Sequence, residues 1–184
     1  QEIMSGLARQ GNRVLFIENT GVRAPQLKDI PRLRKRFLNW IKSIKGFRQV
    51  RKNITVYSPL ILPFPYSKLA SRVNKYLMLA PLQHWMDAAK FYRPIIWSYL
   101  PTKTALDIVD AVDGKLLIYH FIADFHQLVA HTKKLKEFEI RMMKQADILF
   151  VQGEAFKRRS LPYNKNVYIS HFGVNMKVFS YESK

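Results

Sequence analysis

A histidine and a carboxylate follow an apolar run in the middle of the chain. His120 and Asp124 belong to residues 115–124, KLLIYHFIAD, whose first half has the composition of a short buried strand. In an open α/β sheet, ligands bind beyond the carboxyl ends of the strands. The strand would therefore deliver both side chains to the usual place of chemistry. A carboxylate flanked by histidine suits proton transfer when partial burial raises its pKa.

Two other interpretations fit the same residues. Asp124 could cap the helix that follows it, which is a common role for aspartate. His120, His126 and His131 surround Asp124 in the sequence, which leaves a mononuclear metal site open, although the five histidines do not show metal-ligand spacing. The chain has no phosphate-binding loop, dinucleotide fingerprint, zinc-protease motif or nucleophile elbow. These residues alone therefore leave proton transfer, helix capping and a metal site open for this segment.

Short apolar runs alternate with helical periodicities along the chain. The patterns predict strands at residues 13–18, 54–58, 94–99, 115–119, 147–152 and 166–170. They predict helices at residues 1–10, 28–52, 66–92, 103–112, 132–145 and 154–161, and Thr102 can cap the helix at residues 103–112. This alternation predicts an α/β fold, a Rossmann-like parallel sheet with helices on both faces. A helix that opens the chain and leads into a parallel strand indicates that a first strand, before Gln1, is missing.

The composition is that of a basic globular domain. The chain has 184 residues, of which 48% are hydrophobic, and it carries 31 Lys and Arg against 13 Asp and Glu, a net charge of +18. Such an excess indicates a polyanionic neighbour: acidic lipid, nucleic acid or a phosphorylated substrate. The sequence has no cysteine and no long uncharged apolar run, so disulfides, thiolate metal sites and a transmembrane helix are not expected.

The basic charge is concentrated in residues 28–52, with ten Lys and Arg against one Asp. An apolar stripe of Leu33, Phe37, Trp40, Ile41 and Ile44 predicts a basic amphipathic helix suited to an anionic bilayer. The alternative is a helix that packs on its own domain and leaves a solvated basic back. Residues 59–65, PLILPFP, predict an exposed apolar loop that could insert into lipid. The candidate membrane-docking residues are Arg34, Lys35, Arg36, Trp40, Lys42 and Lys45.

Four segments resemble the motifs of one family, in the same order. The opening helix with GNRVLFIE at residues 11–18 resembles the family's L-x-x-x-G-H-x-V opening. Residues 119–125, YHFIADF, resemble the pattern Y-D-x-x-D-x-F of its bacterial envelope branch, with His120 in place of the usual Asp. Residues 137–154 resemble E-x-x-l-l-x-x-A-D-x-v-x-x-x-S, with Gly153 in place of the usual Ser or Thr.

The last segment, residues 169–174 with Asn175 and Phe179, resembles I-x-x-G-V-D-x-x-x-F. The chain thus resembles the N-terminal, acceptor-side domain of a GT-B fold glycosyltransferase of the glycosyl transferases group 1 type family, bacterial envelope and exopolysaccharide branch. The resemblance covers essentially the whole chain. It implies transfer of a sugar from a nucleotide-sugar donor to an acceptor hydroxyl, with no essential metal.

The resemblance also implies a domain plan. Residues 1–175 would form the N-terminal domain, and residues 176–184 would begin an interdomain linker. The C-terminal domain that holds the nucleotide sugar would be absent, so the fragment alone is expected to be inactive and to bind no cofactor. Because many such enzymes modify lipid-linked acceptors, the resemblance implies a cytoplasmic protein, peripheral at the inner face of the cell membrane.

Residue roles follow from the same resemblance. Asp124 and His120 are the candidate catalytic residues, and an inverting transfer would need one base on the acceptor hydroxyl. The candidate acceptor-binding residues are Glu18, Asn19, Arg23, Tyr99 and His126. His171 and Gly173 would line the interdomain cleft.

Two other classes of function remain open. A basic domain rich in aromatic residues could bind nucleic acid. The sequence has no RNA-binding or zinc-finger signature, and its basic residues cluster in one segment, so nucleic acid is not the expected partner. A flavodoxin-like interaction module without catalytic activity is the other alternative, and it would lack a cleft at the strand ends.

Overall fold

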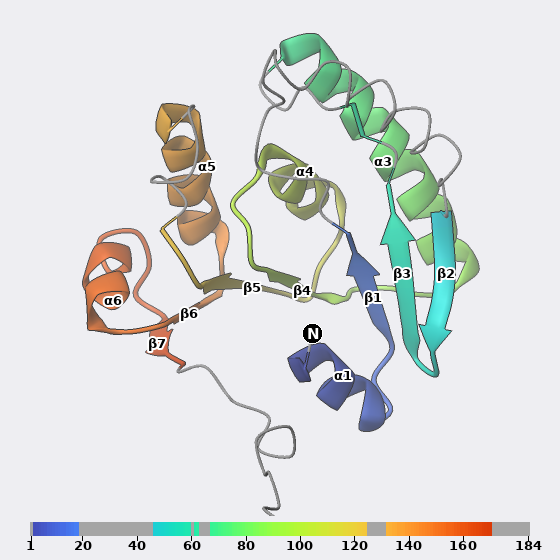
Figure 1. Cartoon of the computed structure of the whole chain (residues 1–184), viewed down its shortest axis with the longest axis horizontal. Coiled ribbons are helices and arrows are strands. Elements are labelled where there is room, and N and C mark those ends of the chain that lie inside the picture. Colours follow the sequence, from blue (N-terminus) through green and yellow to red (C-terminus); the bar gives the residue numbers. More distant parts are fainter. Residues whose placement is uncertain (1, 19–45, 60, 63–66, 125–131, 171–184) are drawn as a thin grey trace, which may run out of the picture. The chain divides into compact units, whose positions relative to one another are not determined.

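The computed structural model describes residues 2–18, 46–59, 61–62, 67–124 and 132–170. The chain divides into two compact units, which we call unit 1 (Gln1–Phe91) and unit 2 (Tyr92–Lys184). Each unit contains strands and helices (Figure 1). The alternation of apolar strands with amphipathic helices predicted from the sequence is therefore present in both.

Unit 1 contains helix α1 (Glu2–Arg9), strands β1 (Val14–Ile17), β2 (Gly46–Arg51) and β3 (Ile54–Ser58), and helix α3 (Lys68–Ala88). Its sheet has the order β1-β3-β2, with β1 parallel and β2 antiparallel to β3. The helix predicted over residues 28–52 is therefore wrong for residues 46–51. The chain reverses at Asn53, whose φ of 65° suits asparagine in a tight turn. The resulting strand β2 stacks Phe47 on Tyr57, with ring centroids 4.1 Å apart.

Helix α3 runs without a break through Pro81. Ser67 caps its start by accepting a hydrogen bond from the N–H of Ala70 at 3.4 Å. Proline has no backbone N–H, so Pro81 removes one hydrogen bond of the helix. Contacts between the buried face of α3 and the rest of unit 1 stabilise the helix in spite of this loss. Among these, the Tyr57 hydroxyl donates to the carbonyl of Met78 at 3.0 Å.

The start of the proline-rich loop is held against α3. Pro59 is buried, and the backbone of Leu62 forms two hydrogen bonds with the Asn74 side chain, at 2.6 and 3.1 Å. The prediction of an exposed apolar loop over residues 59–65 is therefore wrong for Pro59. The buried amide of Asn74 explains this, because it finds its partners in the loop backbone. Residues 60 and 63–65 lie outside the described part of the chain.

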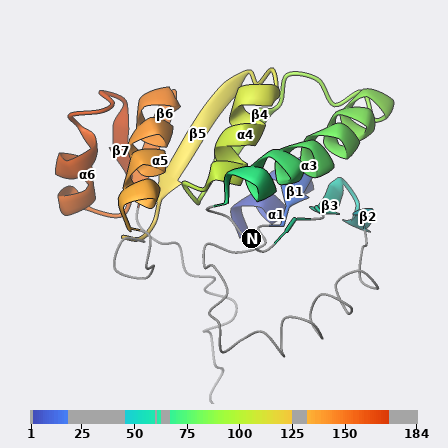
Figure 2. The same ribbon diagram turned by 90° about the horizontal axis from the view of Figure 1, so that it is seen from above.

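Unit 2 contains β4 (Ile95–Ser98), α4 (Lys103–Ala111), β5 (Leu116–Phe121), α5 (Thr132–Gln145), β6 (Ile148–Val151), α6 (Glu154–Ser160) and β7 (Val167–Ile169). Its four strands are all parallel, in the order β4-β5-β6-β7 (Figures 1 and 2). Thr102 caps α4, as the sequence predicts, by accepting from the N–H of Ala105 at 3.1 Å. The predicted fold class, α/β with a Rossmann-like parallel sheet flanked by helices, is confirmed.

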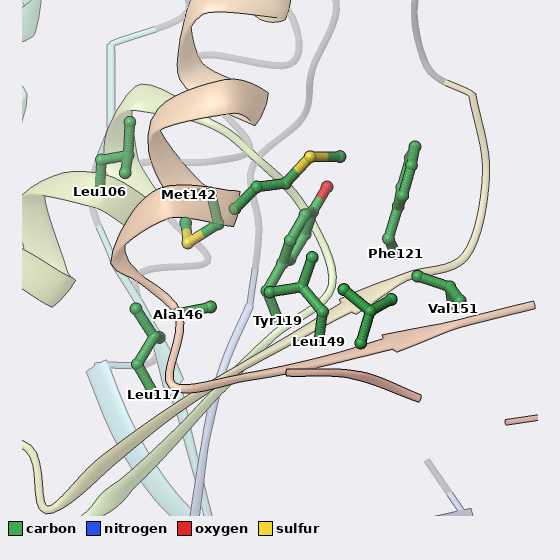
Figure 3. Packing of buried hydrophobic residues seen from close by; sticks show 10 residues of the cluster. Leu106, Leu117, Tyr119, Phe121, Met142, Ala146, Leu149 and Val151 are labelled. Atoms are coloured by element: carbon green, nitrogen blue, oxygen red, sulfur yellow. The ribbon is translucent and has the colours of Figure 1, made fainter. Parts of the chain in front are cut away.

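Alternate residues divide the unit 2 sheet into two faces. One face, which we call the helix face, packs its strand residues against α4, α5 and α6. Figure 3 shows Tyr119, Phe121 and Leu149 of this face beside Met142 of α5 and Ala146, which follows that helix. The other face carries Trp97, Tyr99, His120, Phe150 and Tyr168, and we call it the aromatic face.

Substitution of Leu149 tests how much the core on the helix face contributes to stability, because this side chain is fully buried. We expect Leu149→Ala to lower the free energy of unfolding by about 2–5 kcal/mol, through lost burial and the cavity left behind. Urea denaturation followed by circular dichroism measures this change. Leu161→Ala, at a side chain 45% exposed, is the control and should cost about 1 kcal/mol or less. Equal costs for the two variants would contradict this description of the core.

Candidate functional site

Asp124 lies just beyond the carboxyl end of β5, as the sequence predicts. Its carboxylate accepts a hydrogen bond from the Arg159 guanidinium of α6, with Nη1 and Oδ2 2.9 Å apart. A second guanidinium nitrogen of Arg159 donates to Oε1 of Glu139 on α5 at 2.5 Å. The same guanidinium lies 5.2 Å from the centre of the Phe121 ring. One arginine thus joins the end of β5 to two helices.

The members of this ion-pair network differ in exposure. The side chains of Arg159 and Asp124 are 31% and 33% exposed, whereas that of Glu139 is 1% exposed. Burial raises the pKa of the neighbouring Tyr119 well above its usual value, the charge of Glu139 raises it further, and Arg159 opposes both. Tyr119 therefore remains a neutral phenol and is not a candidate base. The arrangement orients Asp124 and stabilises a buried carboxylate.

His120 lies on the opposite face of β5 from Tyr119. Its ring centroid is 5.3 Å from that of Tyr99, 6.0 Å from that of Phe150 and 6.1 Å from that of Trp97. In the sheet register His120 pairs with Phe150, and Phe150 pairs with Tyr168. Aromatic side chains therefore stand side by side across neighbouring strands. Tyr168 of this row is 54% exposed.

The polar atoms of the aromatic face are buried. His120 is 7% exposed, and neither its Nδ1 nor its Nε2 has a hydrogen-bond partner among the described residues. The indole nitrogen of Trp97 is also buried and has no hydrogen-bond partner among the described residues. Buried polar atoms are normally hydrogen-bonded. Three such atoms on one face are therefore groups that a polar ligand could satisfy.

Burial also sets the protonation of this face. It lowers the pKa of His120 below 6.5 and raises the pKa of Tyr99 above 10.0. At neutral pH the imidazole is therefore uncharged, with one nitrogen that donates and one that accepts. The Tyr99 hydroxyl keeps its proton and can donate a hydrogen bond. An uncharged imidazole is the form that acts as a general base.

The predicted site residues fall into separate environments. Tyr99 and His120 are neighbours on the aromatic face, whereas Asp124 contacts α5 and α6 through Arg159. Glu18 belongs to unit 1, where it follows β1 and accepts a hydrogen bond from the Ser58 hydroxyl at 2.5 Å. Other predicted positions lie outside the described residues: Asn19, Arg23, Arg34, Lys35, Arg36, Trp40, Lys42, Lys45, His126, His171, Gly173 and residues 176–184.

Sequence reasoning missed several residues of the site. Arg159 and Glu139 belong to helices, 35 and 15 positions after Asp124, and no local pattern links them to it. Alternation along their own strands does not place Phe150 and Tyr168 on the same face as His120, because that also requires the register between the strands. The row across the sheet follows only once the strand order is known.

Comparison with known proteins gives no match to a family model and none to a curated protein sequence. Within the residues that the structure describes, no group of His, Asp and Glu could hold a metal ion. No helix there is both long and apolar enough to cross a bilayer.

Removal of Arg159 tests the ion-pair network. We expect Arg159→Met to lower the free energy of unfolding by about 3–5 kcal/mol, because Glu139 keeps its buried charge and loses this cation. Adding Glu139→Met should restore most of the loss. Urea denaturation measures both variants, with Arg141→Met as the control for an exposed pair with Asp110, at a cost of about 1 kcal/mol or less. A double variant no more stable than Arg159→Met would contradict the pairing.

The pH dependence of stability tests the environment of His120. In the unfolded chain a histidine has a pKa near 6.5, and burial lowers the pKa of His120 in the folded state. As the pH falls toward and below 6.5, the unfolded state therefore binds more protons than the folded state. The free energy of unfolding should therefore fall between about pH 7 and about pH 5, and His120→Phe should flatten that decline. Urea denaturation across this range measures it. The exposed His84 provides the control, and a slope unchanged by His120→Phe but flattened by His84→Phe would contradict the assignment.

Proposed function

We propose that the chain is the acceptor-binding part of a glycosyltransferase. In the complete enzyme it would present a sugar acceptor to a nucleotide-sugar donor held by another domain. Support comes from the Rossmann-like parallel sheet and from the order of motifs that resemble this family. The observation that carries the proposal is the buried, uncharged His120 among aromatic rings near the carboxyl end of its strand.

The aromatic face has the chemistry that a sugar requires. The C–H groups of a pyranose pack against the electron-rich faces of aromatic rings. Its hydroxyl groups both donate and accept hydrogen bonds, which matches the nitrogens of His120 and the donor groups of Trp97 and Tyr99. Tyr168, at the exposed end of the row, would extend the platform to a second sugar residue.

The proposed reaction assigns one role to each catalytic candidate. The acceptor hydroxyl oxygen attacks the anomeric carbon of the donor, and the bond from that carbon to the nucleoside diphosphate breaks. His120 takes the proton of the hydroxyl as this bond forms. Asp124, oriented by Arg159, would accept a hydrogen bond from a neighbouring hydroxyl of the acceptor. No metal is required at these residues.

The charge of the chain suggests where the acceptor is. A net charge of +18 favours an anionic surface, and lipid-linked sugars carry phosphates at the membrane. We therefore propose a peripheral enzyme at the cytoplasmic face of the cell membrane with a lipid-linked or envelope glycan as acceptor.

Saccharide binding tests the proposal directly. Saturation-transfer NMR with a panel of neutral, N-acetylated and uronic-acid disaccharides should identify ligands, and titration of the intrinsic tryptophan fluorescence should give their dissociation constants. Tyr168→Ala should raise the dissociation constant about threefold to tenfold, because one stacking surface is lost. Tyr76→Ala, at a side chain 74% exposed in unit 1, is the matched control and should change nothing.

Two results would contradict the proposal. One is a chain that binds no saccharide of the panel. The other is a chain that binds single-stranded oligonucleotides through Tyr168 and is not displaced by saccharides, which would make the aromatic face a base-stacking surface.

A further inference from the structure

The exposed side of helix α3 carries a stripe of apolar side chains. Leu69 is 72% exposed, Val73 38% and Tyr76 74%, and they follow one another at intervals of four and three residues. This spacing places them on one side of the helix. Single exposed apolar residues are ordinary on a protein surface, whereas a contiguous set indicates an interaction site. The opposite side of α3 supplies the buried residues, among them Met78 and Leu82.

Basic residues are interleaved with this stripe. Lys68, Arg72 and Lys75 are exposed on the same half of the helix, and none of them pairs with a carboxylate among the described residues. The sequence contains no Asp or Glu between residues 30 and 86. The surface therefore combines exposed hydrocarbon with an uncompensated positive charge.

We propose that this side of α3 is a docking surface for an anionic lipid bilayer. Leu69, Val73 and Tyr76 would enter the boundary between headgroups and acyl chains. The three basic side chains would lie along that boundary and place their charges among the lipid phosphates. The surface is distinct from the residues 34–45 in which the sequence predicts docking.

A bilayer matches this surface better than other polyanions do. Nucleic acid would engage the lysines and arginine through phosphate, but it offers no hydrocarbon phase for Leu69 and Val73. An anionic bilayer provides both, since its headgroups attract the charges and its acyl chains take up the apolar side chains. This inference does not depend on the aromatic face or on sugar transfer.

Vesicle co-sedimentation of the full chain tests the inference. Phosphatidylcholine vesicles with and without phosphatidylglycerol are compared across a salt series. The α3 variant combines Lys68→Glu, Arg72→Glu and Lys75→Glu. Each basic residue near an anionic surface changes the partition coefficient roughly fivefold, so we expect the variant to lose at least about tenfold in binding.

A matched variant separates local docking from total charge. Lys133→Glu, Lys136→Glu and Lys144→Glu reverse three exposed lysines of α5 and change the net charge by the same amount. This variant should keep binding within about threefold of the wild type, since the proposed docking surface does not include α5. Circular dichroism verifies that both variants are folded.

The apolar stripe has its own test. Leu69→Gln with Tyr76→Gln keeps every charge, so binding at low salt should persist while the part that resists high salt is lost. Three results would overturn the inference: no binding to anionic vesicles, equal losses in the α3 and α5 variants, or salt-resistant binding unchanged by Leu69→Gln with Tyr76→Gln. Binding of oligonucleotides but not vesicles through the α3 lysines would also overturn it.

Discussion

Unit 2 depends on the ion pairs that the guanidinium of Arg159 makes with Glu139 and Asp124. One guanidinium nitrogen pairs with Glu139, whose side chain is 1% exposed, and the other pairs with Asp124 beyond the end of β5. A buried carboxylate is costly without a cation, so the position of α6 against α5 is coupled to this contact. Because the guanidinium also lies over Phe121, the ion pair and the apolar core are parts of one packing arrangement. The segment that carries the candidate carboxylate is therefore fixed by the core.

The alternation of a parallel strand gives β5 two different roles. Tyr119 and Phe121 face the helices and complete a core, whereas His120 between them joins the aromatic face. Burial on that face removes the charge of His120 and keeps the proton of Tyr99. Core packing and the proposed acid–base chemistry thus come from neighbouring residues of the same strand. A shift of the register by one residue would exchange these roles.

The sequence predicts correctly those helices and strands whose conformation depends mainly on neighbouring residues in the chain. The helix over residues 132–145 and the cap at Thr102 follow from apolar periodicity and from a hydroxyl before a helix, and the structure confirms both. Strand β2 was missed because basic residues at 48, 51 and 52 continued a helical charge pattern, while the stacking of Phe47 on Tyr57 decides the conformation. Among site residues, His120 and Asp124 were predicted from one segment. Arg159 could not be predicted, because its contacts depend on how α5 and α6 pack.

We propose that His120 of the aromatic face is an uncharged base that a saccharide contacts. The most direct measurement is the NMR spectrum of the His120 ring nitrogens across a pH titration, with and without the tightest-binding disaccharide. We expect a pKa of His120 below 6.5, the shift pattern of a neutral imidazole at neutral pH, and a change in these nitrogen signals when the saccharide binds. A charged imidazole at neutral pH, or nitrogen signals that stay the same in the saturated complex, would contradict it.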